Sequence, residues 1–305
     1  MIKSNGQEKP LPNGIIPFHA QVAGHIYEPG TKTIGILQDR KDDSVIYKSF
    51  GKPACGIRET KFYMSLEEEA EVEVDEDCQP QRQYEDEEKR EILKELKSFI
   101  PSFYGHVKFN FNGSEYDFLK LENLTRGIQL PCVMDIKIGQ RTYDPLADEE
   151  KIKSEESKYY ECKKGLGFCI PGFQVYDLAN KETKKYSKNF GKKLTPETMP
   201  NALKYFLNIQ NNESNKVHVL LILKQLYKIQ KWCQKQKYFE LFCSSILIIY
   251  DASILNNNLL KPNDEWVHVK MIDFAHVFPI EDKSRHDTNY IFGINNLVQM
   301  FESFV

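Results

Sequence analysis

The spacing of hydrophobic residues in the first third of the chain predicts a hairpin followed by two helices. Short apolar runs in residues 34–50 flank a polar stretch, a pattern typical of a β-hairpin whose last strand is Val45–Lys48. A helix that carries Glu59 is expected next. From Glu91 the apolar residues recur at helical spacing, and Pro101 is expected to end this second helix.

The remainder of the chain predicts further strands and helices in alternation. Strands are expected at 107–111 and 118–121, a helix rich in Lys and Glu at 146–162, and a long helical region at 196–242. The apolar side of that region is expected to hold Val219, Leu220, Leu223, Leu226 and Tyr227. Two buried strands and a last helix complete the pattern: Ser245–Asp251, Trp266–Asp273, and a helix with Ile294, Leu297, Val298 and Phe301 at i, i+3, i+4 and i+7.

The length of the chain favours two lobes over one compact unit. The sequence has 305 residues, which is near the size at which a single hydrophobic core stops growing. The mixture of strands and helices indicates an α+β fold. We expect a loose leader at 1–16, a first lobe at 17–123 and a second lobe at 124–305, with an insert at about 144–200.

Charge is unevenly distributed along the sequence. The net charge is −3, but residues 67–91 contain 13 acidic and 3 basic residues, so the rest of the chain carries a net charge of +7. A basic body favours an anionic ligand. The acidic segment is expected to be a solvated loop, mobile in its most charged part. No DNA- or RNA-binding motif accompanies the basic body, so a nucleic-acid partner is not expected.

Composition excludes several classes of protein. Hydrophobic residues make up 41% and charged residues 28%, which excludes disorder throughout and a collagen-like fibre. The longest apolar stretch, Ile246–Tyr250, is far shorter than the ~20 residues of a membrane span, so no membrane contact is expected. The seven cysteines include no closely spaced pair, which favours free thiols. We therefore expect a cytoplasmic protein, with the nucleus as a second compartment.

A strand at residues 130–139 carries charge in an unusual place. Its period of two puts Cys132, Met134, Ile136 and Ile138 on one face and Asp135 and Lys137 on the other. Charged groups in an apolar strand are costly unless they are paired or solvated in a cleft. The pair is therefore either a structural ion pair or part of a functional cleft.

A second constellation ends the strand before Asp273. Phosphotransferases hold the Mg²⁺ that bridges the β- and γ-phosphates of ATP with a carboxylate at such a position. The sequence Asp273-Phe-Ala differs from the Asp-Phe-Gly of protein kinases by one residue, although an Asp here could simply cap the next turn. Neither the P-loop motif nor the His-Arg-Asp loop of protein kinases is present. Lys48 and Glu59, eleven residues apart, could form the phosphate-binding lysine and its helix partner.

Together these motifs resemble the inositol polyphosphate kinase family. The family signature Pro-x-x-x-Asp-x-Lys-x-Gly is met at Pro131–Gly139, and Ser-Ser-Leu-Leu appears as Ser244-Ser-Ile-Leu247. Ile272–His276 matches the metal-binding block and Tyr290–Leu297 the closing helix. Phe18–His25 looks like the opening block, with Ala20 as an insertion or shift. The resemblance covers about residues 17–301.

The resemblance implies a two-lobed, kinase-like fold with an antiparallel sheet in each lobe and ATP in the cleft between them. It implies ATP and Mg²⁺ as cofactors, with residues 17–123 as the ATP-binding lobe and 124–305 as the lobe of the catalytic and metal site. Asp135 and Lys137 would be catalytic. Asp135 would also contact the ribose of ATP and organise the site. The other nucleotide contacts would come from Lys48, Glu59 and the backbone of Glu122 and Leu124, and Asp273 would be the metal ligand. Ser245 would be structural, with a direct contact to the substrate as the alternative.

The insert at 144–200 would bind the inositol phosphate. Lys151 and Lys158 lie seven apart on one helical stripe, while Lys153 points elsewhere. Glu155 lies between them, so an ordinary surface ion pair is the alternative. Lys192, Lys193 and Lys137 are further candidate contacts. His276 either reaches the substrate or is a packed, hydrogen-bonded histidine.

Subfamily motifs are mixed. Ile246–Asp251 and Gly172–Asp177 look closer to the inositol hexakisphosphate kinases, whereas Gly139–Ala147 looks closer to the multikinases. We expect a monomeric hexakisphosphate kinase that makes a diphosphate and also accepts lower inositol phosphates. The alternatives are a multikinase or trisphosphate 3-kinase, whose hydroxyl acceptor must lose a proton, with Asp135 as the candidate base. An inactive inositol phosphate-binding pseudokinase is the alternative from a different class.

Overall fold

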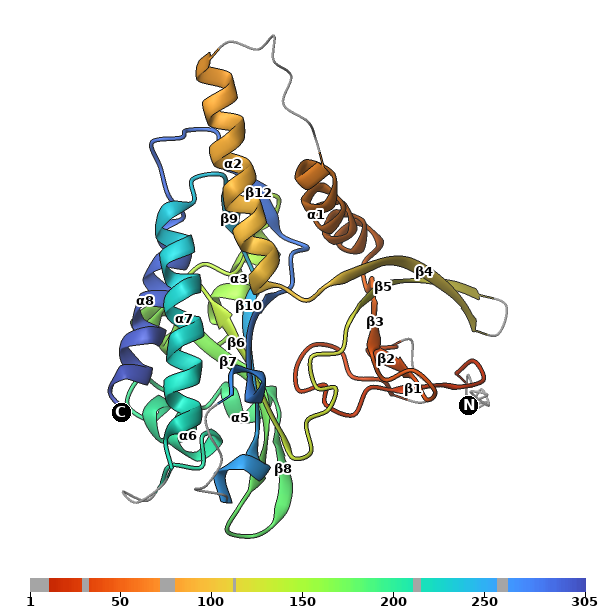
Figure 1. Cartoon of the computed structure of the whole chain (residues 1–305), viewed down its shortest axis with the longest axis vertical. Helices are drawn as coiled ribbons and strands as arrows, with labels where there is room; N and C mark the ends of the chain where they lie inside the picture. Colours follow the sequence, from red (N-terminus) through yellow and green to blue (C-terminus); the bar gives the residue numbers. More distant parts are fainter. Residues whose placement is uncertain (1–10, 29–32, 72–79, 112–113, 211–214, 257–262) are drawn as a thin grey trace.

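The computed structural model describes residues 11–28, 33–71, 80–111, 114–210, 215–256 and 263–305. Two five-stranded antiparallel sheets form its framework (Figure 1). In spatial order the first contains β1 (Ile15–Pro17), β2 (Ile36–Asp39), β3 (Val45–Ser49), β5 (Ser114–Glu122) and β4 (Phe103–Phe111). The second contains β11 (Val267–Ile272), β10 (Ser245–Asp251), β6 (Pro131–Ile138), β7 (Phe168–Asp177) and β8 (Glu182–Tyr186). This arrangement confirms the predicted α+β, two-lobed kinase-like fold.

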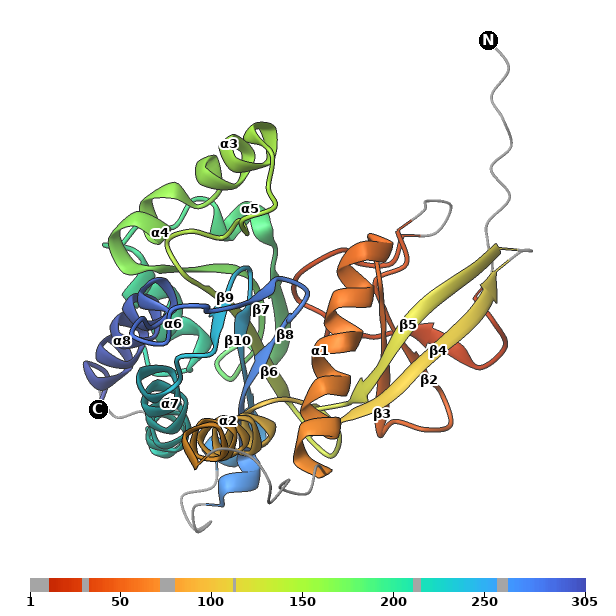
Figure 2. The same ribbon diagram turned by 90° about the horizontal axis from the view of Figure 1, so that it is seen from above.

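Three helices cover one face of the second sheet, and a fourth lies between the two sheets. Helices α2 (Pro80–Phe99), α7 (Val217–Lys235) and α8 (Thr288–Glu302) lie side by side on one face of the second sheet (Figures 1 and 2). Helix α1 (Pro53–Glu71) runs between the two sheets (Figure 2). The smaller elements are α3 (Glu149–Ser157), α4 (Tyr160–Leu166), α5 (Lys188–Gly191), α6 (Met199–Phe206), and the paired strands β9 (Phe239–Leu241) and β12 (Val277–Pro279).

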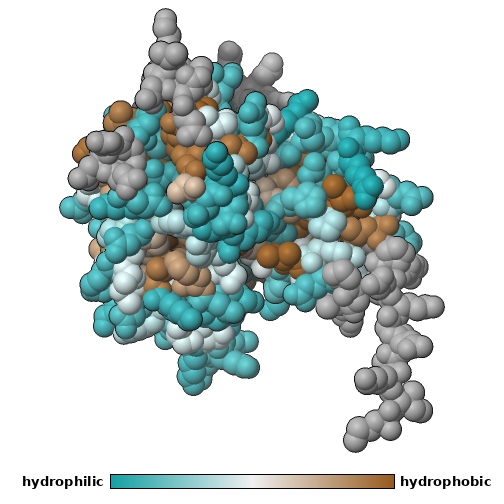
Figure 3. Space-filling model, turned by 90° about the horizontal axis from the view of Figure 1, so that it is seen from below, coloured by the Kyte–Doolittle hydropathy of each residue, from teal (hydrophilic) through white to brown (hydrophobic). Residues whose placement is uncertain are grey.

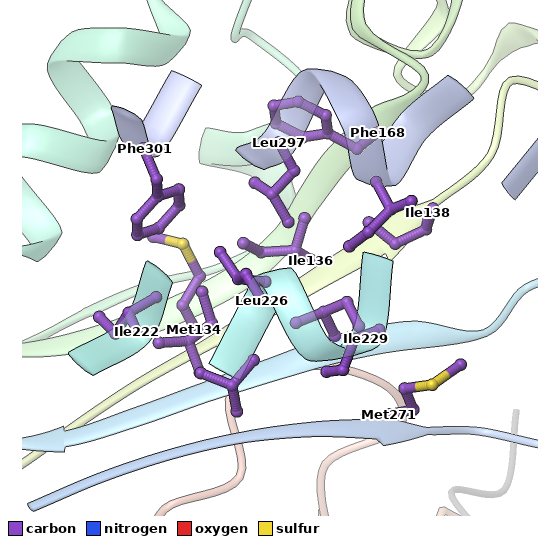
Figure 4. Packing of buried hydrophobic residues seen from close by; sticks show 14 of the residues in the cluster. Met134, Ile136, Ile138, Phe168, Ile222, Leu226, Ile229, Met271, Leu297 and Phe301 are labelled. Carbon is purple, nitrogen blue, oxygen red and sulfur yellow. The ribbon is translucent and has the colours of Figure 1, made fainter. Parts of the chain in front are cut away.

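The main core confirms the predicted two faces of the 130–139 strand. Cys132, Met134, Ile136 and Ile138 are fully buried against the helices. Figure 4 shows three of these side chains packed among Ile222, Leu226 and Ile229 of α7 and Leu297 and Phe301 of α8. Burying a side chain of this size stabilises the fold by about 1.5–3 kcal/mol. The apolar face of β6 therefore fixes the strand, and its opposite face is left to carry charge.

The helical region predicted at 196–242 is correct only in part, since α7 ends at Lys235 and residues 239–241 form strand β9. It divides into α6 and α7, because Asn208 adopts a left-handed conformation with φ 54° after α6 ends. The helix predicted at 146–162 divides for the same reason at Tyr159, φ 54°. The predicted apolar side of this region is wrong at Leu220 and Tyr227, whose side chains are exposed on α7. The predicted strand at 245–251 and the buried side of α8 are confirmed, and the strand predicted at 266–273 is one residue shorter at each end.

The predicted acidic loop at 67–91 is wrong at both ends. Helix α1 continues to Glu71, and α2 already begins at Pro80. Glu, Lys, Arg and Gln are good helix formers, and proline suits the first helical position, so local propensity outweighs charge repulsion here. Only residues 72–79 of the segment lie outside the described residues. The predicted leader is also too long, since Ile15 and Ile16 already pair with β2.

The molecular surface mixes polar and apolar character. Figure 3 shows hydrophobic side chains in separate patches, with hydrophilic residues over most of the rest of that face. In the described part of the chain, the helices are too short or too polar to span a bilayer.

Candidate functional site

A cleft of about 670 Å³ lies between the two sheets. The first lobe contributes residues from β2, β3 and α1, and the second contributes β6, β10 and the segment after β11. Most of the predicted site residues line it: Lys48, Glu59, Glu122, Leu124, Asp135, Lys137, Lys151, Asp273 and His276. Residues from six separate parts of the sequence thus meet in one place.

One ion network joins the lobes across this cleft. The Nζ of Lys48 lies 2.7 Å from Oε1 of Glu59 and 2.5 Å from Oδ1 of Asp273. The same Glu59 oxygen accepts a 3.0 Å hydrogen bond from the backbone N–H of Phe274. Burial alone would lower the pKa of Lys48, but the carboxylates of Asp273 and Glu59 outweigh it and raise that pKa. Lys48 is therefore a fixed cation, and Glu59 holds the turn that carries Asp273.

Asp273 lies at the strand end predicted for it. It follows β11 directly and has a φ of 67°, a left-handed conformation that Asp tolerates better than most residues. Burial would raise its pKa, but the charges of Lys48 and Lys137 outweigh this and lower it. The side chain is 39% exposed, so an ionised carboxylate is accessible from the cleft.

Asp135 and Lys137 occupy the polar face of β6. Antiparallel pairing places Lys137 opposite Ser245 of β10, which in turn lies opposite Ile272, the residue before Asp273. Asp135 is buried, and its Oδ1 has no hydrogen-bond partner among the described residues. Burial and the nearby charge of Asp273 raise the pKa of Asp135 to about 7. At neutral pH this carboxyl group can therefore both release and accept a proton.

The glycine that ends the β6 signature has a clear packing reason. Gly139 has a φ of 110°, and a Cβ added there would lie 2.5 Å from Nδ2 of Asn289. That Asn289 side chain binds the backbone N–H and C=O of Arg141. A larger residue at Gly139 would separate β6 from α8, so the motif is a structural requirement as well as a chemical one.

One wall of the cleft is apolar. A separate hydrophobic cluster includes buried Leu124, Val133 and Ile249, with Phe18 and Leu247 packed against it, and all five residues line the cleft. Glu122 and Leu124 border this wall where the chain leaves β5. The predictions covered the backbone at 122 and 124, and they named Phe18 only as part of a family motif. They missed Val133, Leu247 and Ile249 as cleft residues, although the period of two in β6 and β10 could have indicated them.

The lysine stripe of α3 exists, and so does its ion-pair alternative. Nζ of Lys151 and Nζ of Lys158 lie 3.0 and 2.9 Å from the same oxygen, Oε1 of Glu155. Lys151 and Glu155 line the cleft, whereas Lys158 is not among its lining residues. Lys192 and Lys193 follow α5 and are exposed outside the lining. Their contact with a substrate stays a prediction.

His276 belongs to a cluster that the sequence did not indicate. Its Nδ1 lies 2.5 Å from Oδ2 of buried Asp144. Arg58 of α1 donates from Nε to the carbonyl of Ala275 at 2.9 Å, and its Nη2 is 3.7 Å from Oδ2 of Asp144. These residues are far apart in sequence, so no local pattern could have joined them. His276 is thus a hydrogen-bonded histidine that lines the cleft, and its contact with a substrate stays a prediction.

The family model described as inositol polyphosphate kinase matches residues 118–302. The chain belongs to the inositol polyphosphate kinase family. The inositol polyphosphate multikinase of Rattus norvegicus is 32% identical over 253 residues, covering 82% of this chain and 58% of the relative. Inositol hexakisphosphate kinase 3 of Mus musculus is 31% identical over 198 residues, covering 59% of this chain and 49% of the relative. The chain therefore spans about half the length of these relatives.

Solved structures show the same fold. The crystal structure of inositol phosphate multikinase Ipk2 from S. cerevisiae, determined with ADP and Mn²⁺, matches with a TM-score of 0.60 and 23% identity, covering 86% of this chain and 99% of that one. The family prediction is confirmed by these comparisons. The prediction of a hexakisphosphate kinase is not confirmed, because the multikinase relative matches more of this chain than the hexakisphosphate kinase does.

Proposed function

We propose that this inositol polyphosphate kinase transfers the γ-phosphoryl group of ATP to a hydroxyl group of an inositol polyphosphate, as a multikinase. The observation that carries the proposal is the convergence of Lys48, Asp135, Lys137 and Asp273 in one cleft. These are the charged groups that phosphoryl transfer requires, because its catalysis rests on positioning and charge stabilisation. The multikinase subfamily is supported by the 82% coverage of this chain by the rat multikinase.

The first lobe and the apolar wall suit a nucleotide. The wall of Val133, Leu247 and Ile249 can cover one face of an adenine ring, while the backbone at Glu122 and Leu124 supplies polar groups at its edge. Lys48, held by Glu59 and Asp273, would neutralise ATP phosphates. Asp135 lies next to Val133 on the same face of β6 and would meet the nucleotide between its base and its phosphates.

A divalent cation fits the site at Asp273. In the described part of the chain, no group of three or more His, Cys, Asp or Glu residues is placed to hold a metal ion. Mg²⁺ does not need such a group when ATP is present, since one or two carboxylates and the phosphates hold it. Asp273 is an accessible carboxylate with a lowered pKa. When bound, the cation would neutralise phosphate charge.

The acceptor hydroxyl requires a base, and Asp135 is placed to serve. The hydroxyl oxygen attacks the γ-phosphorus, the bond from that phosphorus to the ADP oxygen breaks, and the hydroxyl proton passes to Asp135. Its unpartnered Oδ1 and a pKa of about 7 match the requirement that a general base titrates near the working pH. Lys137, on the same strand face, would stabilise the charge on the transferred group.

The decisive experiment compares two acceptors. Purified protein is given ATP and Mg²⁺ with inositol 1,4,5-trisphosphate or inositol hexakisphosphate, and the products are resolved by charge. We expect the trisphosphate to be converted to a more highly phosphorylated product. Asp135→Asn should lower kcat by about 10²–10⁴-fold.

Two results would change the proposal. Turnover of the hexakisphosphate alone would make the protein a hexakisphosphate kinase, whose phosphate acceptor is already ionised and needs no base. Absence of turnover with either acceptor, from protein whose circular dichroism shows an intact fold, would contradict the kinase assignment and support the pseudokinase alternative.

A further inference from the structure

Glu155 places a buried negative charge in the wall of the cleft. The residue is 7% exposed and lines the cleft beside Lys151. Its Oε1 accepts hydrogen bonds from Lys151 and Lys158, and its Oε2 accepts a longer one, 3.4 Å, from Oγ1 of Thr142. Burial alone would raise the pKa of Glu155, but the hydrogen bonds from Lys158 and Lys151 outweigh it and lower the pKa to about 2. The carboxylate is therefore ionised at neutral pH.

The surrounding structure keeps this carboxylate in place. The Nζ of buried Lys163 binds the backbone carbonyl of Glu155 and lies 3.2 Å from Oγ1 of Thr142. Lys163 thus ties the end of α3 to the loop that carries Thr142. These contacts hold the main chain of Glu155, and its carboxylate is held by Lys151, Lys158 and Thr142.

Two cations and one anion leave the stripe with a net charge of +1. Lys151 and Lys158 remain 45% and 40% exposed, and an ammonium group has three N–H donors. Each lysine can therefore keep its bond to Glu155 and still offer donors to a ligand. A phosphate group that approaches meets less positive charge than the lysines alone would provide, and the buried carboxylate of Glu155 repels it.

We propose that Glu155 is a specificity-determining residue that limits how much negative charge the acceptor can carry. The inference rests on the proposed kinase function and assigns its acceptor class as inositol phosphates with few phosphate groups. A phosphate monoester carries about −1.5 to −2 at pH 7, so a trisphosphate brings roughly −4.5 to −6 and a hexakisphosphate roughly −9 to −12. Repulsion by one fixed carboxylate grows with that charge and penalises the hexakisphosphate more.

The test compares Glu155→Gln with a matched control on the same helix. Glutamine has the same shape and keeps an oxygen acceptor, but it removes the charge. Glu156→Gln removes the same charge one position away, where Glu156 is exposed, binds the Tyr143 hydroxyl and does not line the cleft. Dissociation constants for inositol hexakisphosphate and inositol 1,4,5-trisphosphate are measured by titration calorimetry for the wild type and both variants.

We expect Glu155→Gln to tighten hexakisphosphate binding at least tenfold more than trisphosphate binding, and Glu156→Gln to change that ratio less than twofold. The effect should shrink as salt is raised, because screening weakens charge interactions. Equal changes for both ligands, no change, or the same change in the control would overturn the inference. Binding is measured separately from turnover, so a wild type that binds both ligands but phosphorylates neither would contradict the kinase function while still testing the role of Glu155.

Discussion

At the scale of single residues, the site contains buried polar groups that lower the stability of the fold but that the proposed reaction needs. Asp135 is the clearest example, since it is a buried carboxyl group without a hydrogen-bond partner at Oδ1 in the described structure. A polar group in this condition lowers the stability of a fold. Its burial and the charge of Asp273 raise its pKa to about 7. The property that suits it to accept a proton is therefore also a source of instability.

The pH dependence of stability follows from this pKa. An unfolded Asp titrates near 3.8 and folded Asp135 near 7. Between these values the folded state holds a proton that the unfolded state has lost, so this group's contribution to stability is fully present below about pH 4 and decreases as pH rises through 7. Asp135→Asn removes the titrating group. We expect the variant to lose most of its activity yet to have a higher Tm than the wild type at pH 8, with a smaller difference at pH 5.5.

Differential scanning calorimetry at the two pH values measures this difference. Asp264→Asn, which changes an exposed carboxylate paired with Lys224, is the control and should leave Tm within a degree at both. A lower Tm for Asp135→Asn at pH 8 would show that the ionised carboxylate stabilises the fold, and it would remove the basis for Asp135 as the base.

At the scale of elements, α1 links Lys48 to the turn that carries Asp273. Glu59 is buried on the side of α1 that faces the second lobe, and it binds both Lys48 and the backbone of Phe274. Glu59→Gln keeps the oxygen acceptor and removes the charge. We expect kcat/KM for ATP to fall at least tenfold, because Lys48 loses one of its two carboxylates.

Glu67→Gln on the same helix is the matched control, since Glu67 forms an exposed ion pair with Lys97. Exposed pairs contribute only about 0–1 kcal/mol, and this pair is remote from the cleft residues, so kcat/KM should change less than twofold. Steady-state kinetics with varied ATP distinguishes the two. Equal effects of both variants would mean that Glu59 acts only on helix stability.

Elements with strong periodicity could be predicted from the sequence, and contacts between distant elements could not. The faces of β6 followed from its period of two, and α8 from its i, i+3, i+4 pattern. Breaks at Tyr159 and Asn208 depend on single left-handed residues that have no glycine to mark them. The contact of Arg58 with Ala275 and Asp144 is formed only when the lobes meet. The motifs thus predicted part of the chemistry of the cleft, but they did not predict the contacts that hold its residues in place.

At the scale of the whole molecule, three polar contacts join the first lobe to the same short segment of the second lobe, beside the cleft. Lys48 with Asp273, Glu59 with Phe274 and Arg58 with Ala275 all connect the first lobe to one short segment after β11. A ligand that binds this segment and the first lobe together should therefore stabilise the whole fold. A ligand at 100 times its Kd contributes about 2.7 kcal/mol.

We expect a non-hydrolysable ATP analogue to raise Tm by a few degrees and Mg²⁺ to add to that rise. Asp273→Asn should retain the rise due to the nucleotide alone and lose the increment due to Mg²⁺, because the metal then lacks its protein carboxylate. Thermal shift assays with the analogue, with and without Mg²⁺, measure the two parts separately. A full Mg²⁺ increment in the variant would place the metal elsewhere in the cleft. Since the increment is read without turnover, it tests the metal ligand independently of which inositol phosphate is the acceptor.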